Sequence, residues 1–274
     1  KFIRTYTNGR VKSIFAGTLV TSILQSSSAV SLMVLAFVGA GIMAMKNAIG
    51  VIIGSNIGTT TTAWIVASFG FKMNIESFAL PIIGIGGLVL IFLGKSDKYS
   101  NVSKLFVSFG FLFLGLSYMK ESVDSLTTNI SIEDIPDYGL LFFILIGTLL
   151  TAAMQSSSAT IAIVLTGVNA GLISFDGAAC MVIGANIGTT ATVLIGGIRA
   201  AQIKKRVAFS HLFFNVSTAI IGFALLYPIT YYIKQIIGPI DENAVVGIAL
   251  FHTIFNVIGV ILFFPFVGVF SNWL

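Results

Sequence analysis

The chain carries an internal repeat. Residues 17–63 align with 147–193 without a gap at a constant offset of 130 residues, and 23 of the 47 aligned positions are identical. The identical pieces include the pentapeptides Q-S-S-S-A and N-I-G-T-T, which occupy 25–29 with 155–159 and 56–60 with 186–190. Such a repeat predicts two structurally equivalent units, each of which places the same polar residues in the same kind of surroundings.

Those surroundings are apolar. Of the 274 residues, 56% are hydrophobic and only 9% are charged, whereas a soluble domain carries roughly a quarter charged residues. Apolar runs of about 17 to 25 residues, the length that crosses a bilayer, recur along the chain. We therefore predict an all-α membrane protein with about six full spans, at 47–69, 77–94, 104–121, 177–198, 207–233 and 245–271.

The two segments that carry Q-S-S-S-A, about 13–40 and 140–170, differ from these spans. Each has room for two short helical arms with the polar cluster between them, which is the pattern of a re-entrant hairpin. Irregular backbone at membrane depth is tolerated only where protein buries it or where it lines a wet cavity. The sequence thus predicts two re-entrant helical hairpins whose polar tips lie inside the protein.

The charges indicate how these elements are oriented. If the hairpins do not cross the membrane, one side holds 12 of the 15 Lys and Arg residues, and the other side holds nine of the ten acids. The positive-inside rule places the basic side, with loops 95–104 and 199–206, in the cytoplasm. Lys46 and Asp176 are equivalent in the repeat but opposite in charge. This is expected for inverted-topology repeats, a feature of secondary transporters.

These assignments divide the chain into three parts. Residues 1–103 form the first inverted repeat, 104–233 the second, and 234–274 a C-terminal transmembrane helix. By the same offset, the span at 104–121 needs a counterpart before residue 1. We therefore expect the first helix of the first repeat to lie upstream of this sequence.

The polar chemistry is neutral, because no charged residue lies in the interior of a predicted span or hairpin arm; the nearest, such as Lys46, Lys120 and Asp176, are at the edges. Hydroxyl and amide N–H groups donate to anion oxygens, whereas hydroxyl, amide and backbone oxygens suit a small hard cation, so one site can hold both. Each hairpin turn also begins a half-helix whose dipole favours an anion. The glycines around N-I-G-T-T predict a second helix break in each copy. Four inward N-termini would then supply about +2 of partial charge at ~0.5 each.

Two simpler interpretations compete with a binding site. Glycine and serine often serve close packing of membrane helices, but the duplication of both polar motifs favours a site. A weaker pair, H-x-x-F-N at 211–215 and 252–256, puts His and Asn on one helix face. A satisfied interhelical hydrogen bond is favoured there over a ligand role. An enzyme is not expected, because metal clusters, nucleophile elbows and paired carboxylates are lacking, and no basic groove indicates a nucleic-acid partner.

With its duplicated Q-S-S-S and the G-x-N-I-G-T-T that follows each copy, the chain resembles the type II sodium-dependent phosphate cotransporter family, including its bacterial members. The resemblance implies sodium-driven symport of inorganic phosphate across the cytoplasmic membrane by alternating access. It implies sodium ions as co-transported species and no organic cofactor. The implied partners are inorganic phosphate, sodium, the lipid bilayer and a cytoplasmic regulatory domain. Many bacterial relatives have this domain after the membrane part, and the present sequence does not include it.

The resemblance also carries roles to individual positions. The implied phosphate ligands are Ser26, Ser27, Ser28, Asn56, Ser156, Ser157, Ser158 and Asn186. The implied sodium ligands are Gln25, Thr59, Thr60, Gln155, Thr189 and Thr190. In vertebrate members an H-x-x-F-N also follows the first repeat, whereas the segment 77–94 lacks it. Transport of another anion, such as sulfate or a carboxylate, and a channel or phosphate sensor are open alternatives.

Overall fold

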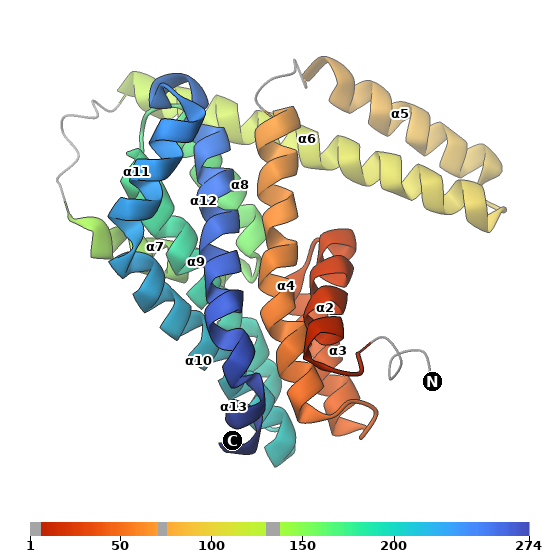
Figure 1. Ribbon diagram of the computed structural model, residues 1–274. Coiled ribbons are helices and arrows are strands. Elements are labelled where there is room, and N and C mark those ends of the chain that lie inside the picture. The colour runs from red at the N-terminus through yellow and green to blue at the C-terminus, as the bar shows by residue number, and fades with distance from the viewer. Residues whose placement is uncertain (1–6, 71–75, 130–137, 274) are drawn as a thin grey trace.

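The regular secondary structure is all helical in the residues that the structure describes, which are 7–70, 76–129 and 138–273 of a computed structural model (Figure 1). The predicted all-α architecture is confirmed. The α-helices are α2 (Arg10–Leu24), α3 (Ser27–Gly39), α4 (Met45–Ile65), α5 (Glu76–Leu93), α6 (Asp97–Asn129), α7 (Leu140–Met154), α8 (Ser157–Asn169), α9 (Phe175–Gly197), α10 (Gln202–Ala224), α11 (Leu226–Ile237), α12 (Ile240–Phe263) and α13 (Val267–Trp273). A π-turn, Val66–Gly70, follows α4, and a 3-10 turn, Phe264–Phe266, precedes α13.

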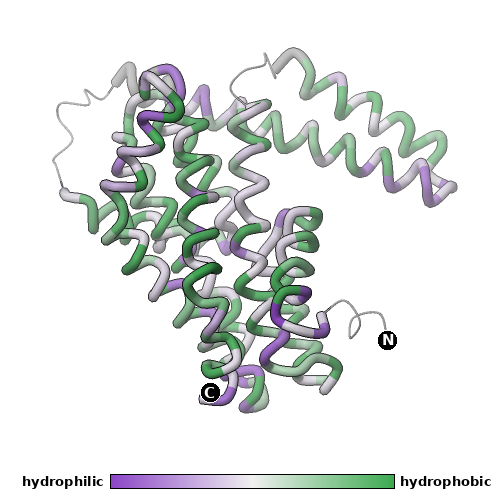
Figure 2. Tube along the Cα trace, viewed as in Figure 1, coloured by the Kyte–Doolittle hydropathy of each residue, from purple (hydrophilic) through white to green (hydrophobic). Residues whose placement is uncertain are grey.

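Five stretches of this fold are long and apolar enough to cross a membrane. They are Met45–Gly70, Asp97–Ser122, Phe175–Gly197, Gln202–Ala224 and Glu242–Trp273. Hydrophobic residues run along most of the helices in Figure 2. The remaining predicted span, 77–94, falls in α5, where the apolar stretch Phe78–Leu93 is shorter. The protein is a multi-pass membrane protein.

The predicted single span at 207–233 is wrong, because the chain forms two helices there. Helix α10 ends at Ala224, and Leu225 leaves helical geometry with φ −94° and ψ 7°. Pro228 has no N–H to donate to the Ala224 carbonyl, and its ring would clash with that carbonyl. The following α11 buries one face, through Leu226, Ile229, Thr230 and Ile233.

The two hairpins form where the sequence placed them. Helices α2 and α3 make the first beside α4, and α7 and α8 make the second, in the upper left part of Figure 1. By contrast, α5 packs on α6, and these two helices extend to the right of the bundle in Figure 1, while the other end of α6 runs behind the bundle and contacts α8. The inverted relation of the two repeats remains our interpretation of the charge pattern.

Each hairpin packs its first arm against the helix that follows it, and the two copies do so in the same way. A Cβ atom on Gly54 would overlap the carbonyl oxygen of Ile14, and one on Gly184 would overlap that of Ile144. Thr18 Oγ1 lies 2.9 Å from the Gly54 carbonyl oxygen. The equivalent Thr148 Oγ1 lies 3.1 Å from that of Gly184. The backbones therefore touch because these positions have no side chain.

This packing overturns the predicted helix break at N-I-G-T-T. Helix α4 runs unbroken through 54–60, and α9 runs unbroken through 184–190. The glycines serve close contact with α2 and α7 rather than a turn. Only the hairpin turns therefore begin new helices, which gives two such N-termini instead of four.

Candidate functional site

The hairpin tips share one backbone geometry. Gln25 and Gln155 adopt the left-handed conformation, with φ 55° and 52°. The serine that follows each is extended and caps the next helix: Ser26 Oγ accepts from Ala29 N and Ser156 Oγ from Ala159 N, both at 3.2 Å. A non-glycine residue in this conformation costs about 1–2 kcal/mol. Such strain is typical of functional sites, where the side chain has a task that glycine cannot perform.

The two tips meet at α4. Thr62 Oγ1 donates to Gln25 Oε1 at 2.6 Å and lies 3.1 Å from Ser158 Oγ. Because Thr62 has one hydroxyl proton and gives it to Gln25, Ser158 must be the donor in the second contact. The backbone oxygen of Gln25, 3.4 Å from Ser158 Oγ, is a second and more distant acceptor for the same Ser158 proton. We call Gln25, Thr62 and Ser158 the tip bridge, since they join the first Q-S-S-S segment to the second.

The repeat contains an equivalent trio, Gln155, Thr192 and Ser28, which does not form this contact. Gln155 is exposed, whereas Gln25 is half-buried. Thr192 Oγ1 is buried and has no hydrogen-bond partner within 7–70, 76–129 and 138–273. Two sets of the same residues are thus in different states in one molecule.

Gln25 should be dispensable for folding but not for activity. We expect Gln25→Gly to change the free energy of unfolding by less than about 1 kcal/mol, because relief of the left-handed strain offsets the loss of two hydrogen bonds, one from Thr62 and one to the Ser22 carbonyl. The same change should lower transport at least tenfold, since the amide that holds Thr62 is gone. Thermal unfolding in detergent and uptake into liposomes measure the two effects. Gln25→Val, which keeps the strain without the amide, should lose both, and wild-type uptake by Gln25→Gly would contradict the assignment.

The threonines of N-I-G-T-T act as oxygen acceptors. Thr59 and Thr60 donate their protons to the carbonyls of Ser55 and Ile57 on their own helix, at 3.0 and 2.8 Å. Thr189 and Thr190 do the same on α9, at 2.9 and 2.6 Å. All four are at most 5% exposed. With the proton committed to the backbone, each hydroxyl presents only lone pairs, which suit a cation rather than an anion.

The asparagine of each N-I-G-T-T is held by the asparagine of an H-x-x-F-N. Asn215 Nδ2 donates to the His211 carbonyl at 2.9 Å, which leaves Asn215 Oδ1 to accept from Asn56 Nδ2 at 2.8 Å. Because a backbone carbonyl can only accept, this chain of bonds fixes the orientation of both amides. Asn56 Oδ1 accepts no hydrogen bond from the described residues and therefore remains an acceptor for another group.

The second copy repeats the arrangement. Asn256 Nδ2 donates to the His252 carbonyl at 2.8 Å, and Asn186 Nδ2 donates to Asn256 Oδ1 at 2.7 Å. The expected interhelical hydrogen bond is therefore present, but the asparagine makes it. The histidine side chains take no part in it: both ring nitrogens of His211 and of His252 are buried without a partner in the part of the chain that the structure describes.

The serines lie at the tips in two environments. Ser27 and Ser157, at 4% and 5% exposure, are buried, as is Ser28, whereas Ser26, Ser156 and Ser158 are half-buried. No group of three or more His, Cys, Asp or Glu side chains that could hold a metal occurs among the described residues. The site is neutral, as the sequence indicates.

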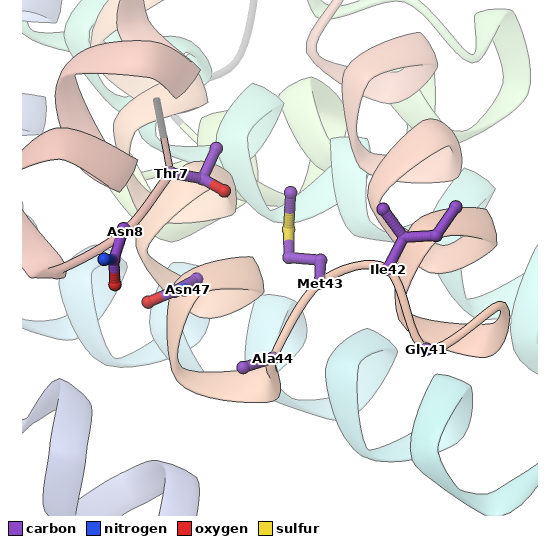
Figure 3. A pocket seen from close by; sticks show the side chains of 7 residues that line it. All are labelled: Thr7, Asn8, Gly41, Ile42, Met43, Ala44 and Asn47. Carbon is purple, nitrogen blue, oxygen red and sulfur yellow. The ribbon is translucent and has the colours of Figure 1, made fainter. Parts of the chain in front are cut away.

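A polar pocket lies apart from the tips. It has a volume of about 390 Å³ and is lined by Thr7, Asn8, Asn47 and the loop 41–44, at the start of α4 (Figure 3). None of the predicted ligands lines it. A second, apolar groove of about 620 Å³ is formed by side chains of α10, α12 and α13, among them Phe213, Phe270 and Trp273.

Sequence reasoning did not name Thr62 and Thr192 as site residues, and it treated Asn215 and Asn256 as structural rather than functional. Thr62 and Thr192 are identical in the repeat, two positions beyond N-I-G-T-T. That identity was a usable signal. The hydrogen-bond partner of each H-x-x-F-N asparagine could not be predicted, because nothing in the sequence indicates which helix faces α10 or α12.

A known protein family matches most of the chain. The family described as Na+/Pi-cotransporter matches residues 1–121 and 140–238. The chain belongs to this family. The uncharacterized protein YqeW of Bacillus subtilis is 31% identical over 268 residues, which cover 97% of this chain and 84% of YqeW.

Two other family relatives have names that refer to phosphate. YjbB of Escherichia coli, whose name proposes inorganic phosphate export, is 27% identical over 92% of this chain, which spans 45% of YjbB. The sodium-dependent phosphate transport protein 2A of Ovis aries is 33% identical over 92 residues, 32% of this chain and 14% of that protein. No solved structure matches the chain.

Proposed function

We propose that the protein is a sodium-coupled symporter of inorganic phosphate that works by alternating access. The observation that carries the proposal is the tip bridge, which joins two Q-S-S-S segments from distant parts of the sequence through Thr62. Membership of the Na+/Pi-cotransporter family supports phosphate and sodium as the transported ions. The name of the ovine relative supports sodium coupling, and that of YjbB favours outward phosphate movement as a second candidate.

Phosphate binds at the hairpin tips. The first amides of α3 and α8 have no intrahelical partner, and the serine hydroxyls of both motifs can donate beside them. Two helix N-termini supply about +1 of partial charge at ~0.5 each. This is less than the charge of a phosphate dianion. The remaining balance comes from sodium, so each ion raises the affinity for the other where water is scarce.

Sodium takes the acceptor oxygens. Thr59 and Thr60 on α4, with Thr189 and Thr190 on α9, present hydroxyl lone pairs only. Asn56 and Asn186 present amide oxygens in the same helical stretches. We therefore move these two asparagines from the phosphate set to the sodium set. Gln25 and Gln155 belong to the tips, where their carbonyl oxygens can serve either the bridge or a cation.

Alternating access follows from the unequal trios. The first trio is bonded, and the second has an exposed Gln155 and an unpartnered Thr192 hydroxyl. In the opposite state, Gln155, Thr192 and Ser28 form the bridge, and Gln25, Thr62 and Ser158 separate. The repeat makes the two states similar in energy, because each loses and gains the same kinds of hydrogen bonds.

The charge pattern supports a location in the cytoplasmic membrane. Loops 95–104 and 199–206 hold basic residues and lie on the cytoplasmic side by the positive-inside rule. In longer relatives a regulatory domain would follow on that side. The function proposed for the membrane part does not depend on it.

The test is uptake of radiolabelled phosphate into liposomes that contain the purified protein. An inward sodium gradient is compared with an equal potassium gradient, and unlabelled sulfate and a carboxylate are added as competitors. We expect phosphate to accumulate only with sodium, and neither competitor to reduce it. A gradient of the opposite direction tests outward movement in the same vesicles.

Other results would overturn the proposal in distinct ways. Inhibition by sulfate would indicate that the protein transports another anion, and currents far above carrier turnover would indicate a channel. Phosphate binding without movement, with or without sodium, would indicate a sensor.

A further inference from the structure

The asparagines of the two H-x-x-F-N motifs have no place in the symport cycle described so far, yet both are buried and bonded across helices. Asn215 is 0% exposed and Asn256 is 2% exposed. Each bonds the asparagine of a different N-I-G-T-T: Asn215 on α10 bonds α4, and Asn256 on α12 bonds α9. We propose that Asn215 and Asn256 are positioning residues that turn the carbonyl oxygens of Asn56 and Asn186 toward sodium, a proposal that rests on the sodium-coupled function.

The amide of a lone asparagine can rotate and present either its oxygen or its nitrogen. An N-I-G-T-T asparagine with a free amide could therefore bind an anion through N–H or a cation through oxygen. The bond from Asn215 to the His211 carbonyl removes this freedom, because it forces Asn215 Oδ1 outward and Asn56 Nδ2 onto it. The backbone of α10 thereby decides which atom of Asn56 is left over.

The Asn56 side-chain oxygen is on the same helix face as the threonine hydroxyls that act as acceptors. Thr59 and Thr60 follow Asn56 by three and four residues, which places the three side chains on neighbouring positions of one helix face. Asn56, Thr59 and Thr60 are each 5% exposed. The same spacing holds for Asn186, Thr189 and Thr190, at 5%, 3% and 3%. A rotated amide would put a donor among these oxygens and would repel a cation.

This role of the asparagine accounts for the spacing of the H-x-x-F-N motif. The asparagine must be four residues after the residue whose carbonyl it uses, because that carbonyl is within reach on the same helix face. The identity of the first residue is immaterial to the bond, since only its backbone takes part. The spacing of the motif is thus a device for fixing an amide on the neighbouring helix.

The experiment uses Asn215→Leu and Asn256→Leu, which keep a branched side chain of similar length but remove donor and acceptor. Sodium dependence of phosphate uptake is measured in liposomes, and sodium-dependent thermal stabilisation is measured in detergent with potassium as the control. We expect the half-saturating sodium concentration to rise about tenfold in each variant, equivalent to one lost ligand interaction. The KM for phosphate at saturating sodium should stay within about twofold, which a general packing defect would not achieve.

Two comparisons separate positioning from packing. Thr218 on α10 is buried and donates only to carbonyls of its own helix, at 2.9 and 3.1 Å, so Thr218→Val should keep the wild-type sodium dependence. In a double-mutant cycle, Asn215→Leu should have no further effect on sodium dependence when Asn56 is already leucine, because it acts through Asn56.

The outcomes are distinguishable. Additive effects in the cycle, or an unchanged sodium dependence in a folded Asn215→Leu protein, would overturn the positioning role while leaving sodium-coupled transport intact. A wild-type protein that sodium neither drives nor stabilises would overturn the symport itself, and the positioning role with it. If Asn215→Leu does not fold, Asn256→Leu in the second copy decides the matter by the same measurements.

Discussion

Gly184→Ala is expected to destabilise the protein by several kcal/mol, whereas Gly115→Ala should stabilise it slightly. The Cβ of alanine at 184 would overlap the carbonyl oxygen of Ile144, and backbone cannot move aside as a side-chain end can. Overpacking of a well-packed core costs about 1–3 kcal/mol and more where backbone must shift. At 115, on α6, a Cβ meets nothing within 4 Å. There the ordinary helix preference for alanine over glycine, about 0.5–1 kcal/mol, should remain.

Thermal unfolding in detergent, with gel filtration of the same samples, measures both variants. Gly54→Ala provides a second instance, because its Cβ would overlap the carbonyl oxygen of Ile14 in the first copy. We expect Gly54→Ala and Gly184→Ala to behave alike. A protein that tolerates alanine at both positions would show that α2 and α7 do not lie against α4 and α9 as closely as described.

The hairpins were predictable because their signal is local and duplicated. A glutamine and three serines lie between two apolar arms in both copies of the repeat. Such a polar cluster is not expected in the middle of a single membrane span. The glycines in and just before N-I-G-T-T carried no such local signal. Glycine permits both a helix break and a close helix contact, and the choice depends on whether another backbone lies against it. That neighbour, Ile14 for Gly54, is 40 positions away along the chain.

The site was predictable in its residue types but not in its connections. Gln25, Ser158 and the threonines follow from the motifs, and the structure places Gln25 and Ser158 together. Thr62 lies outside the motif that drew attention, although the repeat preserves it. The H-x-x-F-N asparagines show a different limit. Their spacing predicts a shared face, but the partner helix is set by packing among α4, α9, α10 and α12, which no short pattern encodes.

If the protein alternates between the two proposed states, the tip bridge predicts how substitutions shift the equilibrium between them. Thr62→Val removes the hydroxyl that joins both tips, and Thr192→Val removes the hydroxyl that we place in the opposite bridge. Because each substitution weakens one state only, the two should shift the equilibrium in opposite directions. One net hydrogen bond of about 1 kcal/mol corresponds to a roughly fivefold change in the population ratio.

Cysteines beside the tips can report this shift. Ala29 is exposed and its repeat equivalent Ala159 is half-buried, so exchange of the bridges should exchange their exposure. We expect Thr62→Val to speed the reaction of Ala159→Cys with a small neutral thiol reagent, and Thr192→Val to slow it. The reverse should hold at Ala29→Cys. The native Cys180 is 0% exposed, so the protein without an added cysteine gives the background. Equal changes in both variants would mean that the two trios are not alternatives, and the unpartnered Thr192 hydroxyl would then need another role. Opposite changes would mean that a duplicated threonine two positions past N-I-G-T-T sets which half of the carrier is closed.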